Sequence, residues 1–231
     1  EKAKAGLRNW QANNPGALEA ASTRGSAIHL GCENYLRGID PGVPEEYQDF
    51  WNGISTYLDW FDVLHWSERP LRPDWNHLRS DDREVAYVWS TEHLYAGCPD
   101  LIGEIGGVKV IADFKTSNAP YCSQFPAKGD RIGFGGFRKY QKCAQQMAAY
   151  RLALEERTGY HCDVALIIVS TPETTQGIFI DGDQMDLYES RFLKRCQMFH
   201  DMENNNNEIE DCSSQEVQEQ NKPAESSDGL V

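Results

Sequence analysis

Closely spaced cysteines, long apolar runs and an excess of basic residues are all missing from this 231-residue chain. Its seven cysteines, at positions 32, 98, 122, 143, 162, 196 and 212, include no pair with C-x-x-C spacing. Scattered cysteines in odd number indicate reduced thiols in a cytoplasmic protein and argue against the closely spaced ligands of an iron–sulfur cluster. No apolar run approaches the roughly 18 residues of a membrane span and no signal peptide is visible, so no membrane partner is expected.

Basic residues are outnumbered, with 22 Lys and Arg against 36 Asp and Glu, which gives a net charge of −14. Such a charge argues against a generally basic surface for nucleic acid. Half of it is local, because residues 203–231 hold eight acidic residues and one lysine, a net of −7. An asparagine run and a Ser/Gln/Glu bias predict that this segment is a disordered acidic tail. Residues 1–202 then form one domain with a sizeable core.

Two short apolar runs, 101–105 and 108–112, flank the dipeptide Gly106-Gly107, which predicts a β-hairpin with a two-residue turn. Asp100 stands at the start of the first strand, and Asp113 and Lys115 stand at the end of the second. In an antiparallel hairpin these two places lie side by side. The period of two puts Asp113 and Lys115 on one face of the strand and Phe114 on the other. Two carboxylates and one ammonium group are therefore expected at one place.

Oxygen ligands of this kind suit Mg²⁺ and other hard divalent cations. A cation held by Asp100 and Asp113 would polarise a phosphodiester and lower the pKa of a bound water. Lys115 would then orient that water or stabilise the charge that develops in the transition state. The alternative is a surface hairpin that carries ordinary charges.

Pro99-Asp100, twelve residues and then Asp113-Phe114-Lys115 resemble the signature of the PD-(D/E)XK nuclease superfamily. The wider segments 96–102 and 111–117 resemble its RecB-type exonuclease branch, which includes phage exonucleases and the mitochondrial genome maintenance exonuclease. The resemblance spans roughly residues 7–202 and is weakest over 38–83. It implies a Mg²⁺ or Mn²⁺ cofactor and a DNA partner that is single-stranded or has free ends. It further implies a role in replication, recombination or repair, in a bacterial or phage-infected cell.

A histidine extends the resemblance, because the segment 24–29 resembles the family's G-x-x-H motif. The resemblance implies that His29 binds the metal or lies beside it, whereas a lone helix histidine is more often structural. Glu33 lies one helical turn later, and its role stays open. Relatives often carry a glutamate where Glu84 lies, so Glu84 is a further acidic candidate and Glu92 a weaker one.

Gln146 and Tyr150 resemble the Q-x-x-x-Y motif of RecB-type nucleases, which implies a position close to the active site and DNA. Without the resemblance, they are a half-buried polar pair one turn apart on a helix.

A local positive patch is expected over 128–142. This segment contains five basic residues and one acidic residue, Asp130, which give a net charge of +4. Its glycines predict a long loop over 118–138, and phenylalanines alternate with the charges. Basic groups neutralise phosphates and aromatic rings stack bases. The candidate nucleic-acid-binding residues are Lys128, Arg131, Phe134, Phe137, Arg138, Lys139 and Lys142.

Secondary structure follows from periodicity and from breaks in the chain. Helices are expected over 7–21 (broken near 13–16), 22–36, 45–66, 139–157 and 183–202, and strands over 84–90, 101–105, 108–112, 163–170 and 176–180. Residues 38–83 are expected to be a helical and loop insertion, with a surface loop over 69–83. Aromatic residues over 47–64 fit core packing, or else a wall beside single-stranded nucleic acid. This order predicts an α/β fold, α+β-like, with a mixed central sheet flanked by helices. The resemblance implies a PD-(D/E)XK, restriction-endonuclease-like core.

The sequence therefore predicts a metal-dependent DNA exonuclease that hydrolyses phosphodiester bonds. His29, Asp100 and Asp113 are expected to bind Mg²⁺ or Mn²⁺. Catalysis is expected to involve Asp100, Asp113, Lys115, Gln146 and Tyr150. Three alternatives stay open: an endonuclease of the same superfamily, a DNA-end-binding module without catalysis, and a hydrolase of small phosphoesters.

Overall fold

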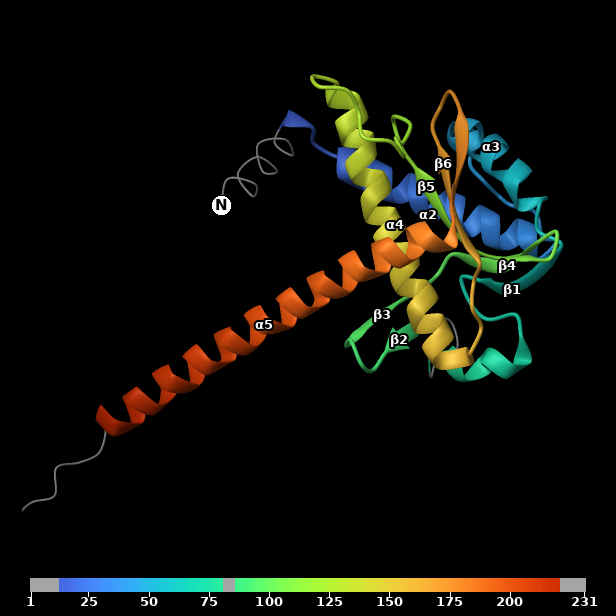
Figure 1. Cartoon of the computed structure of the whole chain (residues 1–231). Helices are drawn as coiled ribbons and strands as arrows, with labels where there is room; N and C mark the ends of the chain where they lie inside the picture. Colours follow the sequence, from blue (N-terminus) through green and yellow to red (C-terminus); the bar gives the residue numbers. More distant parts are fainter. Residues whose placement is uncertain (1–12, 81–85, 221–231) are drawn as a thin grey trace, which may run out of the picture. The chain divides into compact units, whose positions relative to one another are not determined.

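The computed structural model describes residues 13–80 and 86–220, which divide into two units. The first unit reaches to Phe192 and contains a sheet with helices on both faces (Figure 1). From Leu193 on, the second unit holds the later part of helix α5 (Gly182–Gln220), which exposes Met198, Phe199 and Met202. Among the described residues, no helix combines the length and apolarity needed to span a membrane.

The central sheet has five strands in the order β1-β4-β5-β6-β7. Their bounds are β1 (Val63–Ser67), β4 (Leu101–Ile105), β5 (Val108–Thr116), β6 (Val164–Ser170) and β7 (Thr175–Ile180). Every neighbouring pair is antiparallel except β5 and β6, which are parallel. A parallel pair needs a long crossover, and helix α4 (Arg131–Thr158) lies in that connection. The predicted mixed sheet flanked by helices is confirmed.

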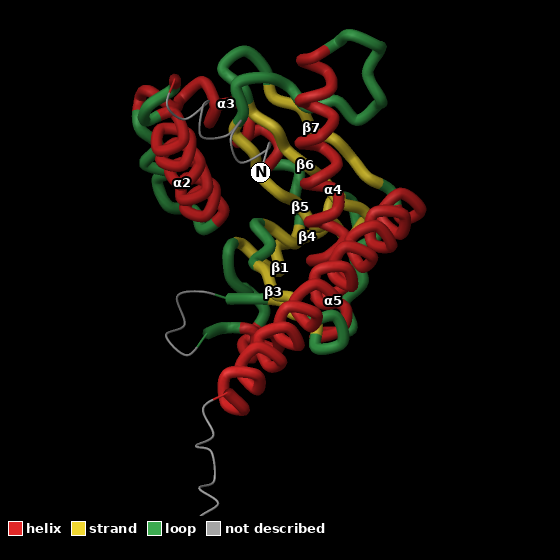
Figure 2. Tube along the Cα trace, turned by 90° about the vertical axis from the view of Figure 1, so that its left-hand side faces the viewer, coloured by secondary structure: helices red, strands yellow, loops and turns green. Residues whose placement is uncertain are grey.

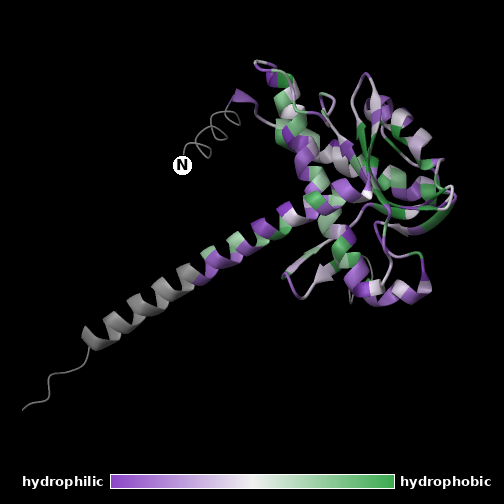
Figure 3. Ribbon diagram, in the orientation of Figure 1, coloured by the Kyte–Doolittle hydropathy of each residue, from purple (hydrophilic) through white to green (hydrophobic). Residues whose placement is uncertain are grey.

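Alternate residues of the central strands face two separate cores. The even-numbered residues of β5 from Val110 to Phe114 pack against helices α2 (Ala17–Leu36) and α3 (Gln48–Leu58). Ile111, on the opposite face of β5, packs against α4. Figure 2 shows α2 and α3 on one side of the sheet and α4 on the other. Both faces are therefore buried, which explains the hydrophobic strands between more hydrophilic helices in Figure 3.

The predicted hairpin is confirmed. Gly106 and Gly107 have φ values of 58° and 82°, the left-handed conformation that a type I′ turn requires at both central residues. The register pairs Ile105 with Val108 and Leu101 with Ala112.

Helix α2 is longer than predicted. The chain break at 13–16 is confirmed by Gly16, whose φ of 76° lies in the left-handed region. Beyond it, a continuous helix runs from Ala17 to Leu36, so the expected second start at 22–26 is wrong. Residues 7–12 of the first expected helix lie outside the described part of the chain.

The predicted helix over 45–66 is wrong in its last third. A 3₁₀ turn η1 (Glu45–Tyr47) leads into α3, which ends at Leu58, and strand β1 follows. Apolar residues at positions 61 and 64 continue the helical spacing, but pairing with β4 at the edge of the sheet determines the local structure. Trp66 is buried in β1 and its Nε1 donates to the Pro99 carbonyl at 2.6 Å.

The expected surface loop over 69–83 contains the 3₁₀ helix η2 (Pro73–Leu78), with Trp75 and Leu78 buried in the core. Of the strand expected over 84–90, the structure contains β2 (Val88–Ser90), which pairs with β3 (Tyr95–Gly97) in a separate two-stranded sheet. Residues 84 and 85 lie outside the described part. Helix α5 continues past the expected end at residue 202, and the disorder of the acidic tail stays a prediction.

The long loop expected over 118–138 is shorter, because α4 begins at Arg131 rather than at residue 139. Asp130 caps the helix, and its Oδ1 accepts a hydrogen bond from Gly133 N at 2.8 Å. Gly136 lies where the preceding loop crosses the helix, and an added Cβ would come within 2.8 Å of the Pro120 carbonyl oxygen. This glycine allows close packing and does not form a turn, so the tertiary contact outweighs its low helix propensity.

Two neighbouring glycines of α4 give a matched test. Gly136→Ala should lower the free energy of unfolding by about 1–3 kcal/mol, because the backbone of 120–122 must shift. Gly135→Ala meets no atom within 4 Å and should raise it by about 0.5–1 kcal/mol. Urea unfolding curves of both variants measure the difference. Equal effects of the two substitutions would contradict the close packing at Gly136.

Candidate metal centre

The two hairpin aspartates meet at the end of the sheet, as predicted. Asp100 directly precedes β4, and its Oδ2 accepts a hydrogen bond from Phe114 N of β5 at 2.7 Å. This bond fixes the Asp100 carboxylate next to Asp113. Both side chains are buried, Asp100 with 6% and Asp113 with 0% of its surface exposed. The pair therefore lies in a medium of low dielectric constant, where charge is costly.

Asp113 and Lys115 form an ion pair with Nζ 2.6 Å from Oδ2. Phe114, between them, belongs to the core under α2 and α3, so the predicted alternation along β5 is confirmed. Asp113 Oδ1 is buried and has no hydrogen-bond partner among the described residues. A carboxylate oxygen of this kind needs a partner from outside the chain.

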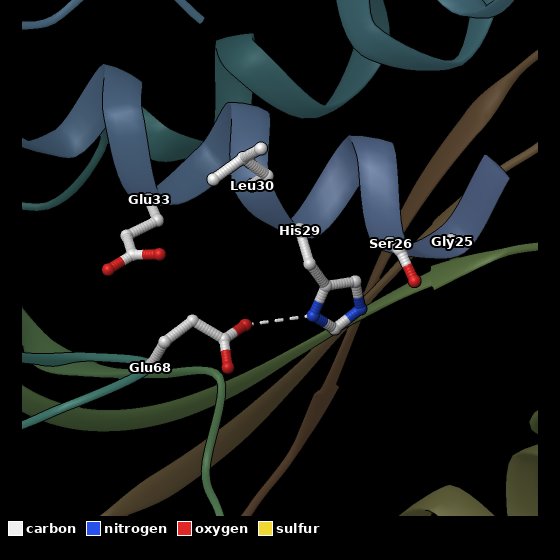
Figure 4. Close-up of a pocket in the computed structure, with 6 residues that line it drawn as sticks. All are labelled: Gly25, Ser26, His29, Leu30, Glu33 and Glu68. Carbon is white, nitrogen blue, oxygen red and sulfur yellow. Dashed lines mark hydrogen bonds and ion pairs between the residues drawn. The ribbon is translucent and has the colours of Figure 1, made fainter. Parts of the chain in front are cut away.

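Helix α2 adds His29 to the site. Its Nδ1 lies 2.8 Å from Glu68 Oε1 and 3.8 Å from Asp100 Oδ1, and its Nε2 lies 3.2 Å from the Phe114 carbonyl oxygen. Figure 4 shows the Glu68 carboxylate turned toward the imidazole. Burial lowers the pKa of His29, but the charges of Asp100 and Glu68 raise it to about 9 overall. The protonated ring donates to Glu68 and to the Phe114 carbonyl.

One ligand atom from each of His29, Glu68 and Asp100 lies within 4.8 Å of the other two. We call these three residues the acidic cluster. Of the predicted metal ligands, His29 and Asp100 belong to it, and Asp113 lies beside Asp100 without belonging to it.

Glu68 is the residue that the sequence interpretation missed. It directly follows β1, whose Ser67 pairs with Leu101 of β4. In this antiparallel pair, Glu68 and Asp100 are the residues just beyond the paired ends, and Glu68 N donates to the Asp100 carbonyl at 2.8 Å. The available signal for Glu68 was the short strand Val63–Ser67 that precedes it. The sequence interpretation assigned most of this segment to a helix and therefore missed Glu68.

Burial is the largest influence on both aspartates. It raises the pKa of Asp100, although His29 and Lys115 oppose the change. Burial and the neighbouring charge of Asp100 raise the pKa of Asp113 to about 7, although Lys115 opposes the change. The site thus holds negative charge that protons or a cation must compensate. Carboxylates with one imidazole suit a divalent cation such as Mg²⁺ or Mn²⁺, and the unpartnered Asp113 Oδ1 fits such an ion.

A pocket of about 450 Å³ opens onto the acidic cluster (Figure 4). It is lined by Gly25, Ser26, His29, Leu30, Glu33 and Glu68. His29 and Glu68 therefore line a cavity that a ligand can enter.

Gln146 and Tyr150 lie on α4 and contact each other, with Gln146 Nε2 donating to the Tyr150 hydroxyl at 2.9 Å. Burial raises the pKa of Tyr150, and the charges of Asp113 and Asp100 raise it further. Tyr150 packs on Gly97 of β3, where an added Cβ would lie 2.1 Å from the ring. Tyr150 is therefore within electrostatic range of the two aspartates, and Gln146 is its hydrogen-bond partner.

The predicted nucleic-acid-binding residues are only partly gathered. Lys128 lies in the loop and the other basic residues lie on α4, not in a loop. Arg131, Arg138 and Lys142 are exposed and share one helix face, which we call the basic stripe. Lys139 Nζ donates to Ser117 Oγ at 3.0 Å, just after β5.

The predicted aromatic residues of this region, Phe134 and Phe137, are half-buried. Each packs edge-on against Phe125, with ring centroids 5.2 and 5.4 Å away. Phe125 itself is 73% exposed, so it is the ring available to a ligand. Phe125 was not among the nucleic-acid-binding residues predicted from the sequence.

The remaining acidic candidates divide. Glu33 lines the pocket and binds two arginines, Arg37 and Arg69. Glu92 lies in the β2–β3 turn with an 80% exposed side chain and does not belong to the acidic cluster. Glu84 lies outside the described residues.

In comparisons with protein-family models and with curated proteins, nothing matches this chain.

The buried aspartates predict how stability depends on pH. Between the unfolded-state pKa near 3.8 and the folded-state pKa of about 7, Asp113 keeps its proton only in the folded chain. The metal-free protein should therefore lose stability as pH rises through this window. Melting temperatures in EDTA at about pH 5 and about pH 7.5 measure the loss.

Asp113→Asn removes this titration, so its melting temperature should fall less over the same interval. Mn²⁺ should stabilise the unchanged protein more at the higher pH, because the ion replaces the proton. The same pH dependence in both proteins would rule out Asp113 as the titrating group.

Proposed function

We propose that this chain is a metal-dependent DNA exonuclease with a RecB-type PD-(D/E)XK core. Its substrate would be a phosphodiester at a single-stranded DNA end, in replication, recombination or repair. The observation that carries the proposal is the buried pair Asp100 and Asp113, with Lys115 beside Asp113 and with His29 and Glu68 grouped around Asp100. The resemblance of segments 96–102 and 111–117 to RecB-type nucleases supports it.

The metal ligands in this proposal are His29, Glu68, Asp100 and Asp113. In that position, Mg²⁺ or Mn²⁺ would supply Lewis-acid chemistry, which polarises a phosphodiester and lowers the pKa of a bound water. His29 must lose its proton to become a ligand. Metal affinity should therefore rise with pH.

Lys115 supplies positive charge and does not act as a base. Burial lowers its pKa, but the charges of Asp113 and Asp100 raise it above the usual value. Its ammonium group stays protonated at neutral pH and can donate hydrogen bonds to developing negative charge. Tyr150, within range of the same carboxylates, and its partner Gln146 are suited to positioning the substrate.

A polymeric substrate is favoured over a small phosphoester by the basic stripe and by Phe125. Arg131, Arg138 and Lys142 recur along about three turns of α4, a length suited to several phosphates of one strand. Phe125, next to this stretch, offers an exposed ring on which a base can stack.

A timed digest tests the function and separates the alternatives. Labelled linear single strands, linear duplexes and circular single strands are incubated with Mg²⁺, Mn²⁺ or EDTA. Metal-dependent loss of nucleotides from linear strands alone supports the exonuclease, and cleavage of circles identifies an endonuclease. Binding without cleavage identifies an end-binding module. Cleavage of a small aromatic phosphodiester alone identifies a small-molecule hydrolase.

The catalytic assignment predicts different losses at different residues. Asp100→Asn and Glu68→Gln should abolish Mn²⁺ binding in calorimetry and cleavage together, because each removes a charged ligand. Lys115→Ala, assayed at saturating Mn²⁺, should lower turnover by roughly 10²–10³, the range for losing one electrostatic stabiliser. Saturation matters because Lys115 also opposes the rise in the pKa of Asp113.

Two charged residues outside the candidate site serve as controls. Lys109→Ala removes an ammonium group from the other end of β5, and Glu92→Gln removes an exposed carboxylate. Both variants should keep turnover and Mn²⁺ affinity. Full activity of Asp100→Asn, or an equal loss in Lys109→Ala and Lys115→Ala, would refute the assignment.

The basic stripe predicts a salt effect. Replacing Arg131, Arg138 and Lys142 with glutamine should weaken single-stranded DNA binding. The slope of log K against log salt should become shallower by about 0.7 for each phosphate that the variant no longer neutralises. Phe125→Ala should weaken binding without changing the slope, because stacking releases no counterions. Arg191→Gln, an exposed charge on α5, is the control. An unchanged slope in the triple variant would exclude the stripe as the strand's path.

A further inference from the structure

Three arginines gather beside the pocket of the acidic cluster, outside the residues that the proposed mechanism uses. Arg37 directly follows α2, Arg69 directly follows Glu68, and Arg79 directly follows η2. The end of α2 and the segment 69–79 thus bring guanidinium groups to one place, and we call these three residues the arginine cluster. In a chain with a net charge of −14, such a concentration of positive charge is informative.

Glu33 holds two of these arginines. Its Oε1 lies 2.5 Å from Arg37 Nη2 and 3.1 Å from Arg69 Nη2. One carboxylate oxygen therefore receives both guanidinium groups, an arrangement that also suits an oxygen of a phosphate group. The Arg37 and Arg69 side chains keep 25% and 30% of their surface exposed, so a solute can reach them.

Arg79 adds charge that Glu33 does not balance. Its Nη2 donates to the Pro70 carbonyl at 2.7 Å, and its Nε has no hydrogen-bond partner among the described residues. Burial lowers the pKa of Arg37, and the positive charges of Arg69 and Arg79 lower it further, against the effect of Glu33. Arg69 and Arg79 therefore both act on Arg37 as like charges, and an additional anion beside Arg37 would relieve that repulsion.

The arginine cluster and the acidic cluster share one pocket. Glu33 and His29 both line it and lie one turn apart on α2, about 6 Å along the helix axis. In Figure 4 the carboxylates of Glu33 and Glu68 extend into the same space beside α2. A spacing of one turn is comparable with that of neighbouring phosphates in an extended single strand.

We propose that Arg37 and Arg69, with Arg79 behind them, form a phosphate-binding subsite, and that Glu33 occupies this subsite in the free protein. The subsite receives the phosphate next to the one at the acidic cluster. The inference rests on the proposed function for its ligand, a nucleic-acid strand. Glu33 acts as an internal competitor that the phosphate displaces.

Binding without hydrolysis tests the subsite. A fluorescent oligothymidylate of about 12 nucleotides is titrated in EDTA, which prevents cleavage, at several salt concentrations between about 50 and 200 mM. Arg69→Gln and Arg37→Gln should each weaken binding about tenfold, because each removes a hydrogen bond to a charged group. Each should also make the salt slope shallower by about 0.7. Glu33→Gln should bind as tightly as the unchanged protein or more tightly, because the competitor is gone.

The response of Glu33→Gln distinguishes a subsite from a purely structural ion pair. If Glu33 only anchors Arg37 and Arg69, Glu33→Gln should lower the melting temperature and weaken binding as much as the arginine variants do, and the proposal is overturned. Arg72→Gln is the matched control, since Arg72 lies in the same loop but pairs with Asp74 at 2.8 Å. It should leave binding unchanged.

The test is independent of catalysis. Unchanged affinity in Arg37→Gln and Arg69→Gln overturns the subsite even if the protein cleaves DNA. Conversely, the expected pattern in EDTA supports the subsite even if the digest detects no cleavage.

Discussion

The register of the β4–β5 hairpin determines where the charged groups of the site lie. Leu101 pairs with Ala112, so Asp100 and Asp113 come together just beyond that pair. A slip of one residue would turn Asp113 toward the apolar core of α2 and α3, and Phe114 toward α4. The positive φ values of Gly106 and Gly107 fix the turn, and the cost of burying the Asp113 carboxylate among apolar side chains opposes the slip. The candidate site thus depends on the same packing that holds the sheet together.

Burying two carboxylates side by side is unfavourable unless each finds a partner. Lys115 serves Asp113, and Phe114 N together with His29 serves Asp100. These partners do not complete the set, because Asp113 Oδ1 has none among the described residues. The elevated pKa of both aspartates expresses the same deficit. The two carboxylates therefore lower the stability of the metal-free fold, and a cation that binds them would raise it again.

The parts of the site that could be predicted are those fixed by short-range rules. A Gly-Gly turn between two apolar runs specifies a hairpin, and the period of two then assigns Asp113, Phe114 and Lys115 to their faces. Glu68 could not be found in this way, because its place depends on β1 pairing with β4, two segments far apart in the sequence. The start of α4 was missed for a related reason. Gly136 is required by the backbone of residues 120–122, and no local pattern reveals that packing.

The basic stripe of α4 belongs to a chain whose net charge is −14, and this contrast affects the kinetics of any encounter with a polyanion. Beyond a Debye length of about 10 Å, the ligand experiences mainly the repulsive total charge. At close range, it experiences the local attraction of Arg131, Arg138 and Lys142. Added salt should therefore speed association by screening the repulsion, and speed dissociation by screening the attraction. A polyanion that approaches away from the basic stripe is repelled and leaves quickly, whereas one that approaches along the stripe is held.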